Sequence, residues 1–140
     1  MISLLLVAAL AQAEPLTGLD GTPLDCEHAQ YQGDMNRCAY LDLETADKTM
    51  NTQWKRAAAV LKEKDAEVER DHDRQPGWFD TLLAAQRAWL AFRDHTCLLA
   101  SFEARGGTMA PQLEAQCKTN LTDMRTEELR EIADGHADDR

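Results

Sequence analysis

Cysteine and histidine occur together twice in this chain, as Cys-Glu-His at residues 26–28 and as its mirror image, His-Thr-Cys, at residues 95–97. Two thiolates and two imidazoles form a ligand set that zinc accepts as a tetrahedron. Zinc sites, however, usually leave two to four residues between paired cysteines. On a helix, residues i and i+2 also point about 200° apart, so neither pair would converge on a metal. The spacing therefore predicts that the chain holds no metal and no other cofactor.

Nucleophilic catalysis by a cysteine meets the same objection. A catalytic cysteine needs a free thiolate beside an imidazole, and on a helix His95 points away from Cys97. The sequence lacks the glycine patterns typical of a nucleophile elbow, a phosphate-binding loop or a dinucleotide site. Carboxylate pairs carry no specificity in a chain with 25 acidic residues. We expect a binding protein and no enzyme, and only a free, reactive Cys97 would revive the catalytic hypothesis.

The elements that would position these residues are helices. Apolar residues recur at steps of three and four along most of the chain, whereas a strand would alternate at every second residue. We expect a long amphipathic helix over about residues 32–72, a second from about Trp78 and a third from about Pro111. Breaks at Gln75-Pro76-Gly77 and at Arg105-Gly106-Gly107-Thr108 separate them.

The apolar stripes of these helices predict which side chains are buried. On the second helix, Trp89 and Phe92 are interpreted as packing residues. The stripe expected on the third helix consists of Leu113, Cys117, Leu121, Met124, Glu128 and Ile132. Residues 14–24, with two prolines and two glycines, are expected to be an irregular lead-in. Residues 134–140 have nothing to bury and are expected to be a disordered tail, so the helical domain would span residues 25–133.

The first thirteen residues, MISLLLVAALAQA, resemble a secretory signal peptide. Residues 2–10 form an apolar run of suitable length, and Ala11-Gln12-Ala13 fits the small-x-small cleavage pattern. Cleavage after Ala13 would leave a chain long enough for one domain with its own core. No cysteine directly follows the cleavage site, so we expect no lipid anchor. The mature protein is predicted to be periplasmic or secreted.

The net charge of −10 restricts the possible partners. Nucleic acids and anionic membrane surfaces attract lysine and arginine, so this balance argues against both. It is compatible with a basic protein partner. Solubility is the more general explanation of such a charge.

Export changes the interpretation of the four cysteines, because disulfides persist in an oxidising compartment. Cys26, Cys38, Cys97 and Cys117 allow three connectivities. Cys97 and Cys117 lie nearly equidistant from the glycine turn between the second and third helices. In an antiparallel hairpin such residues face each other, so a bridge between Cys97 and Cys117 is geometrically natural.

That pairing leaves Cys26 with Cys38. Twelve residues of unbroken helix would hold the two cysteines about 18 Å apart, beyond the reach of a disulfide. The chain must therefore fold back between them, and we expect this at Gly33. The predicted fold class is all-α: one long amphipathic helix packed against an antiparallel helical hairpin, stapled by two disulfides.

Polar residues also fall on or beside the faces that should be buried, namely Asp47, Asn51, Gln86 and Arg93. A buried charge needs a partner, since leaving one unpaired costs several kcal/mol. We expect Arg93 to pair with Asp47 across the first two helices, with Asn51 and Gln86 completing the network. Arg125 and Glu128 could form a second set on the third helix. Fixing the register of the helices is favoured over binding a ligand, since interior polar networks commonly specify packing.

One stretch carries a family resemblance. The run L-x-x-A-Q-R-A-W-L-x-F-R-D-x-x-C, residues 82–97, resembles the signature of the lysozyme inhibitor LprI N-terminal family, formerly a domain-of-unknown-function family. Further matching pieces follow in order, and the resemblance covers about residues 26–132. These pieces are Asp34-Met35-Asn36-Arg37-Cys38-Ala39, Ala46-Asp47-x-x-Met50-Asn51, Gly106-Gly107-Thr108, Cys117 and Thr122-x-x-Arg125-x-x-Glu128-Leu129.

The resemblance implies an exported, mainly helical, disulfide-bonded bacterial domain and, for some members, inhibition of lysozyme. The leading hypothesis is thus a periplasmic protein that inhibits a lysozyme-type peptidoglycan hydrolase. Contacts could come from the turn at residues 106–111 or from the acidic end of the first helix. The alternative is an interaction or scaffold module whose partner is another envelope protein.

Overall fold

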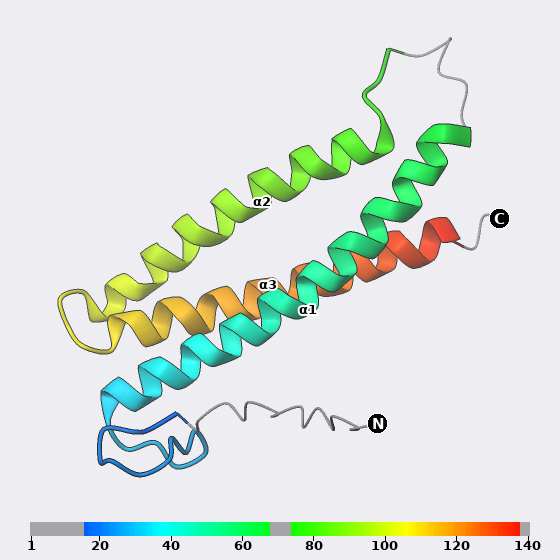
Figure 1. Cartoon of the computed structure of the whole chain (residues 1–140). Coiled ribbons are helices and arrows are strands. Elements are labelled where there is room, and N and C mark those ends of the chain that lie inside the picture. The colour runs from blue at the N-terminus through cyan, green and yellow to red at the C-terminus, as the bar shows by residue number, and fades with distance from the viewer. Residues whose placement is uncertain (1–15, 68–73, 138–140) are drawn as a thin grey trace, which may run out of the picture.

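The computed structural model describes residues 16–67 and 74–137. The described residues form three α-helices: α1 (Gln32–Glu67), α2 (Trp78–Ser101) and α3 (Ala110–Ala137) (Figure 1). A short 3₁₀ turn, η1 (Phe102–Ala104), follows α2. Within these ranges the only β pairing is an isolated bridge between Thr17 and Pro23. The all-α prediction is confirmed. The predicted signal peptide lies outside the described residues.

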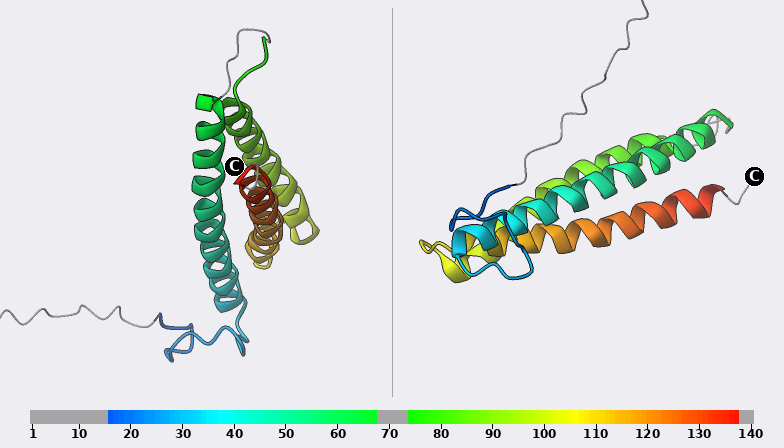
Figure 2. Two further views of the ribbon diagram at one scale, coloured as in Figure 1. Left: turned by 90° about the vertical axis from the view of Figure 1, so that its right-hand side faces the viewer. Right: turned by 60° about the horizontal axis from the view of Figure 1, so that its bottom comes forward.

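The three helices run up, down and up in an elongated bundle (Figures 1 and 2). The interface between α1 and α3 is the largest, α2 packs mainly on α3, and its contact with α1 is the smallest. The predicted arrangement of a long helix against a helical hairpin is therefore present. None of the helices in the described ranges is long and apolar enough to cross a membrane.

The hydrophobic core occupies the end of the bundle where α1 finishes and α2 begins. Its buried members are Met50, Ala57, Leu61, Leu82, Leu129 and Ala133, with Trp54, Phe79, Trp89 and Ile132 packed against them. Asp65 of α1 fixes the entry of α2, because its carboxylate accepts the backbone N–H groups of Trp78 and Phe79 at 2.8 and 3.0 Å. These N–H groups have no partner within their own helix, so Asp65 caps α2 from a neighbouring element.

The buried face of α3 differs from the predicted stripe. It consists of Ala115, Thr122, Thr126, Leu129 and Ala133. Met124 is 63% exposed, and Glu128 is also exposed. Threonine carries little hydropathy signal, but on a helix its hydroxyl can donate back to its own backbone, as Thr126 does to the carbonyl of Thr122 at 2.8 Å. A face of alanine and threonine is therefore buried without appearing apolar in the sequence.

Both ends of the helical domain also differ from expectation. The helix α3 continues to Ala137, so the prediction of disorder is wrong for residues 134–137. There, Asp134 pairs with Arg56 of α1 at 2.5 Å, which gives this last part of α3 a partner. Residues 138–140 lie outside the described range. The helix α1 is described to Glu67, and residues 68–73 of its predicted charged end are outside the described residues as well.

Candidate functional site

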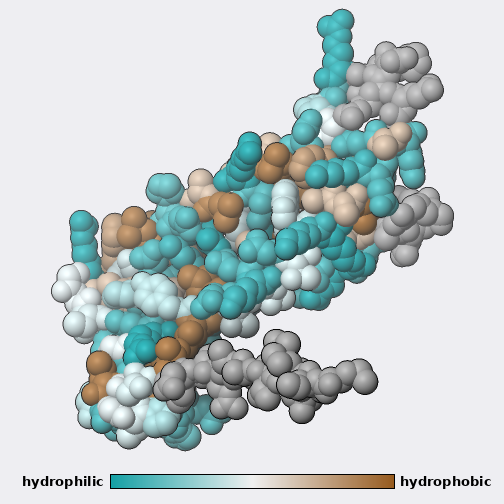
Figure 3. All heavy atoms as spheres, in the orientation of Figure 1, coloured by the Kyte–Doolittle hydropathy of each residue, from teal (hydrophilic) through white to brown (hydrophobic). Residues whose placement is uncertain are grey.

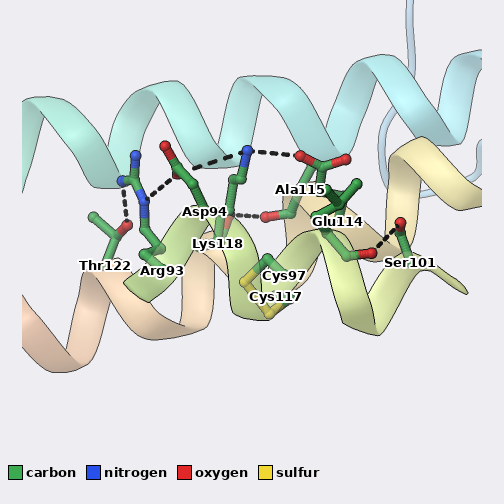
Figure 4. The surroundings of a disulfide bond; sticks show 11 residues. Arg93, Asp94, Cys97, Ser101, Glu114, Ala115, Cys117, Lys118 and Thr122 are labelled. Carbon is green, nitrogen blue, oxygen red and sulfur yellow. Dashed lines mark hydrogen bonds and ion pairs between the residues drawn. A yellow bond between two sulfur atoms is a disulfide. The ribbon is translucent and has the colours of Figure 1, made fainter. Parts of the chain in front are cut away.

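Two disulfides define one end of the bundle, opposite the hydrophobic core. Cys26 is bonded to Cys38 and Cys97 to Cys117, with Cα atoms 5.6 and 5.4 Å apart. Both predicted pairings are confirmed. Figure 4 shows the second bridge joining α2 to α3. All four cysteines are oxidised, so none of them offers a thiolate to a substrate or a metal.

The fold-back that brings Cys26 to Cys38 does not occur at Gly33. The helix α1 already begins at Gln32, and Gly33 is not among the glycines with positive φ. The chain reverses earlier, in the irregular residues 26–31. Gly33 serves close packing instead, because a Cβ placed there would lie 2.7 Å from the Cδ1 atom of Leu19.

A layer of polar contacts separates the disulfide end from the hydrophobic core, with Arg93 at its centre. The Arg93 side chain, in a residue only 8% exposed, places Nη1 2.7 Å from the Asp47 carboxylate and donates to the Thr122 hydroxyl at 3.0 Å. Its Nε lies 3.2 Å from Asp94 (Figure 4). Arg93 thus joins α2 to α1 and α3. The predicted pair of Arg93 and Asp47 is present in the structure, whereas Thr122 and Asp94 were not foreseen.

Gln86 belongs to a second group and lies about two turns of α2 nearer the core than Arg93. Its Oε1 accepts a hydrogen bond from Arg125 Nε at 2.9 Å, and Arg125 Nη1 lies 2.7 Å from Glu128. Trp89 lies between the two groups, with the guanidinium carbons of Arg93 and Arg125 at 5.2 and 6.0 Å from its ring centre. The prediction that Gln86 completes the Arg93 network is therefore wrong, since its partner is Arg125.

Asn51 and Phe92 also lie elsewhere than the sequence predicts. Asn51 is exposed and makes no hydrogen bond to the polar residues named above. It follows the buried Met50, and one residue along a helix turns the side chain about 100° away from the core. Phe92, next to Arg93, is 57% exposed for the same reason, whereas the predicted packing of Trp89 is seen.

His95 faces the solvent and does not approach Cys26 or His28. Its Nδ1 lies 2.7 Å from the carbonyl oxygen of Ala91 on its own helix. Within residues 16–67 and 74–137 no group of three or more histidine, cysteine, aspartate or glutamate side chains is arranged to hold a metal.

The irregular segment before α1, residues 16–31, is called the N-terminal loop below. Asp34, which is buried in the first turn of α1, accepts the backbone N–H of Leu19 with both carboxylate oxygens, each at 3.1 Å. Arg37 donates to the carbonyl of Thr17. Sequence reasoning missed both anchors, although an acidic residue at the start of a helix is a common point of attachment for free N–H groups.

The N-terminal loop forms a pocket of about 300 Å³. Its walls include Asp20, Asp25, His28 and Tyr31, and Asp34 lies at its base in α1. Hydrogen bonds from the Thr22 hydroxyl and the Thr22 backbone N–H hold the pKa of Asp20 below its ordinary value. The pKa of Asp25 is lowered by His28, whose Nδ1 lies 2.9 Å away, and by the backbone N–H of Glu27. Both carboxylates therefore stay negatively charged under mildly acidic conditions.

The N-terminal loop and the turn between α2 and α3 lie at the same end of the bundle, the disulfide end (Figures 1 and 2). Two contacts tie α1 to this turn and to the start of α3: Asn36 donates to the Thr108 carbonyl at 3.0 Å, and Gln32 to Gln112 at 2.7 Å. The other region considered as a contact surface, the charged end of α1, lies at the opposite end of the bundle (Figure 1).

Most of the large apolar side chains that are exposed also lie at the disulfide end. Figure 3 shows apolar residues in separate patches, along α2 and at the loop. Those at the disulfide end are Leu16, Leu19, Tyr31, Tyr40, Leu98, Leu99, Phe102 and Met109. Exposed apolar side chains that gather at one end make this end the candidate interaction surface.

Comparison with known proteins agrees with this architecture. Residues 25–129 match the sequence profile of the family described as lysozyme inhibitor LprI. The chain is 41% identical over 108 residues to an uncharacterized protein of Rhizobium meliloti (strain 1021), covering 77% of this chain and 78% of that protein. No solved structure matches the chain. The matched residues include both disulfides, the polar layer and most of the core, and we conclude that the chain belongs to the LprI lysozyme inhibitor family.

Proposed function

We propose that this protein is an exported inhibitor of lysozyme-type peptidoglycan hydrolases. The observation that carries the proposal is the match of residues 25–129 to the lysozyme inhibitor LprI family. The protein would act by binding over the cleft of the enzyme, in which two carboxylates perform the hydrolysis. It would contribute no catalysis of its own.

The charge of the molecule supports this proposal. A protein of net charge −10 is steered electrostatically towards a basic enzyme, and such steering raises the rate of association. Steering weakens as salt screens the charges, so inhibition should be strongest at low ionic strength.

The proposed location is the periplasm or the space outside the cell. The two disulfides and the family indicate a protein that works outside the cytoplasm. Cleavage of the first thirteen residues near Ala13 would release it after export. Mass spectrometry of the protein recovered from the periplasm of an expressing bacterium tests this, and a chain that still begins at Met1 would contradict it.

A cell-wall clearing assay tests the inhibition. Protein purified with its disulfides intact is added in increasing molar ratio to egg-white lysozyme and to lysozymes of other structural types. We expect clearing to slow in proportion to the protein added for at least one enzyme. The same protein, reduced and alkylated, is the control. The absence of slowing with every lysozyme would remove the proposal.

The exposed apolar surface of α2 favours a second candidate, an interaction module for another envelope protein. Phe92, Leu98 and Leu99 project from this helix without a neighbour covering them in the described structure. Recovery of one stoichiometric periplasmic partner, together with a negative lysozyme assay, would favour this function over inhibition.

A further inference from the structure

We propose that the N-terminal loop, residues 16–31, is the surface through which this protein binds the basic enzyme. This inference rests on the proposed function, since it assigns the contact surface for that inhibition. The occupant is a positively charged face of a lysozyme-type protein. The experiment below distinguishes this surface from the other surfaces that could make the contact.

Apart from His28, which pairs with Asp25, the charged groups of the loop are of one sign. The loop contains three carboxylates, Asp20, Asp25 and Glu27, and no lysine or arginine. All three residues are exposed. Acidic residues elsewhere are in part neutralised: on α1 Lys48 pairs with Glu44, and on α3 Arg130 pairs with Glu127. The exposed carboxylates of the N-terminal loop therefore suit a cationic partner.

The loop is also held in one conformation before any partner binds. The bond between Cys26 and Cys38 fixes one side, and the Asp34 carboxylate fixes the other through the backbone of Leu19. The backbone pairs with itself, from Gly18 N–H to the Thr22 carbonyl and from Leu24 N–H to the Leu16 carbonyl, at 2.8 and 2.7 Å. A preorganised loop loses little conformational entropy on binding, so more of the contact energy becomes affinity.

Apolar side chains stand beside the carboxylates. Leu19 is 65% exposed and Tyr31 54% exposed, although both lie in a part of the chain that is otherwise well anchored. Interfaces typically combine such apolar anchors with a polar rim, and tyrosine is enriched among the residues that carry most binding energy. The N-terminal loop offers both kinds of contact.

The pocket in the N-terminal loop is a place where one side chain of the enzyme could insert. Its volume of about 300 Å³ is at the lower end for ligand pockets and has room for one long side chain. With Asp20 and Asp25 on its wall, the side chain that suits it best is a lysine or arginine of the enzyme. The Asp34 carboxylate already accepts the Leu19 N–H, so the exposed carboxylates would make the ionic contact.

The exposed face of α2 is the competing surface. Phe92 and Leu99 are exposed there, but nothing on this face would attract a basic enzyme in preference to any other protein. It therefore supplies the comparison variant for the test.

The experiment measures inhibition constants for the intact protein and three variants against a lysozyme that the intact protein inhibits in the clearing assay. The loop variant is Asp20→Asn, Asp25→Asn and Glu27→Gln, which keeps the shape of each side chain. The matched control is Asp123→Asn, Glu127→Gln and Glu131→Gln on α3, which also removes three negative charges but at a different surface. The third variant is Phe92→Ser with Leu99→Ser. We expect the loop variant to inhibit at least about tenfold more weakly and with less dependence on salt, and the other two to change less than about threefold.

Two outcomes overturn the assignment while leaving the proposed function intact. One is undiminished inhibition by the loop variant, and the other is equal weakening by the loop and α3 variants, which would make net charge the sole cause. Loss of inhibition only in the α2 variant would move the contact to that helix. No inhibition of any lysozyme by the intact protein in the clearing assay would remove the function and the surface together. Should the loop variant fail to fold by circular dichroism, Leu19→Asn, at an exposed side chain, tests the same surface alone.

Discussion

At the scale of single residues, Arg93 shows how a buried charge can organise three helices. It extends from α2, pairs with Asp47 of α1 and donates to Thr122 of α3. The ring of Trp89 covers one side of the guanidinium. A buried ion pair gives little net stability over an apolar replacement, but removing one partner leaves the other unsatisfied. We therefore propose that Arg93 fixes the register of the three helices and does not bind a ligand.

Replacement of Arg93 by alanine should lower the free energy of unfolding by about 2 kcal/mol, because Asp47 and Thr122 lose their partner. For a domain of this size that is a fall of about 6–10 °C in Tm, measured by circular dichroism. The exposed Arg87 on the same helix gives the control, and Arg87→Ala should change stability by less than about 0.5 kcal/mol. An unchanged Tm for Arg93→Ala would show that the polar layer has no structural role.

The carboxyl of Asp20 offers a second test at this scale. Its pKa is lowered chiefly by the Thr22 hydroxyl, so the ionised form is favoured in the folded protein. The resulting stabilisation is present above the ordinary value of 3.8 and is lost as the pH falls through the lower pKa of the folded state. NMR titration of the Asp20 carboxyl should give a midpoint below 3.8, and Thr22→Val should move it upwards. A midpoint at or above 3.8 in the intact protein would disprove the hydrogen bond.

At the scale of elements, the main finding is the contact between α1 and α3. The buried face of α1 includes Ala39, Ala46, Ala57 and Ala58, and that of α3 includes Ala115 and Ala133. Small side chains on both helices let their axes approach closely along much of their length. The exposed apolar residues of α2 fit this arrangement, because the interface of α2 with α1 and α3 is smaller than the interface between α1 and α3.

The orientation of α3 can be tested with two substitutions. Leu129 is fully buried, so Leu129→Ala should cost about 2–5 kcal/mol through lost burial and the cavity left behind. Met124 belongs to the stripe that the sequence predicted as buried, yet Met124→Ala should cost less than about 0.5 kcal/mol. Chemical denaturation of both variants gives the comparison. Similar losses in the two would mean that α3 is rotated relative to the described structure.

At the scale of the whole molecule, the bundle is stabilised differently along its length. Hydrophobic packing holds the end near Leu82 and Leu129, the polar layer around Arg93 follows, and two disulfides hold the other end. The surface with the most exposed apolar side chains thus coincides with the end that is covalently fixed. A binding surface can remain apolar and exposed there because the disulfides keep its shape without requiring that those side chains be buried.

The two disulfides should therefore have different effects when removed. Cys97→Ser with Cys117→Ser should lower the global stability by about 3 kcal/mol, because this bridge joins two helices. Cys26→Ser with Cys38→Ser should mainly speed hydrogen exchange at the hydrogen-bonded amides of the N-terminal loop, leaving the protection of α2 and α3 in place. Unchanged exchange in the loop would show that Asp34 and Arg37 hold it unaided.

Local patterns in the sequence determined the elements and several of their connections. Helical periodicity places the start of α2 at Trp78, the glycine turn separates α2 from α3, and equal distances from that turn pair Cys97 with Cys117. The pairing of Arg93 with Asp47 could also be deduced, because a charge on a buried face needs an opposite charge on a facing helix. Each of these follows from short-range geometry or from the cost of an unpaired charge.

Only the tertiary structure decided which face of α3 is buried, that Gln86 bonds to Arg125, and that Phe92 is left exposed. Periodicity gives the existence of a stripe, but its orientation depends on the neighbour against which it packs, and alanine and threonine give hydropathy little to detect. The N-terminal loop has no periodicity at all. Its shape follows from contacts with Asp34 and Cys38, which lie on α1 and reach it only when the chain is folded.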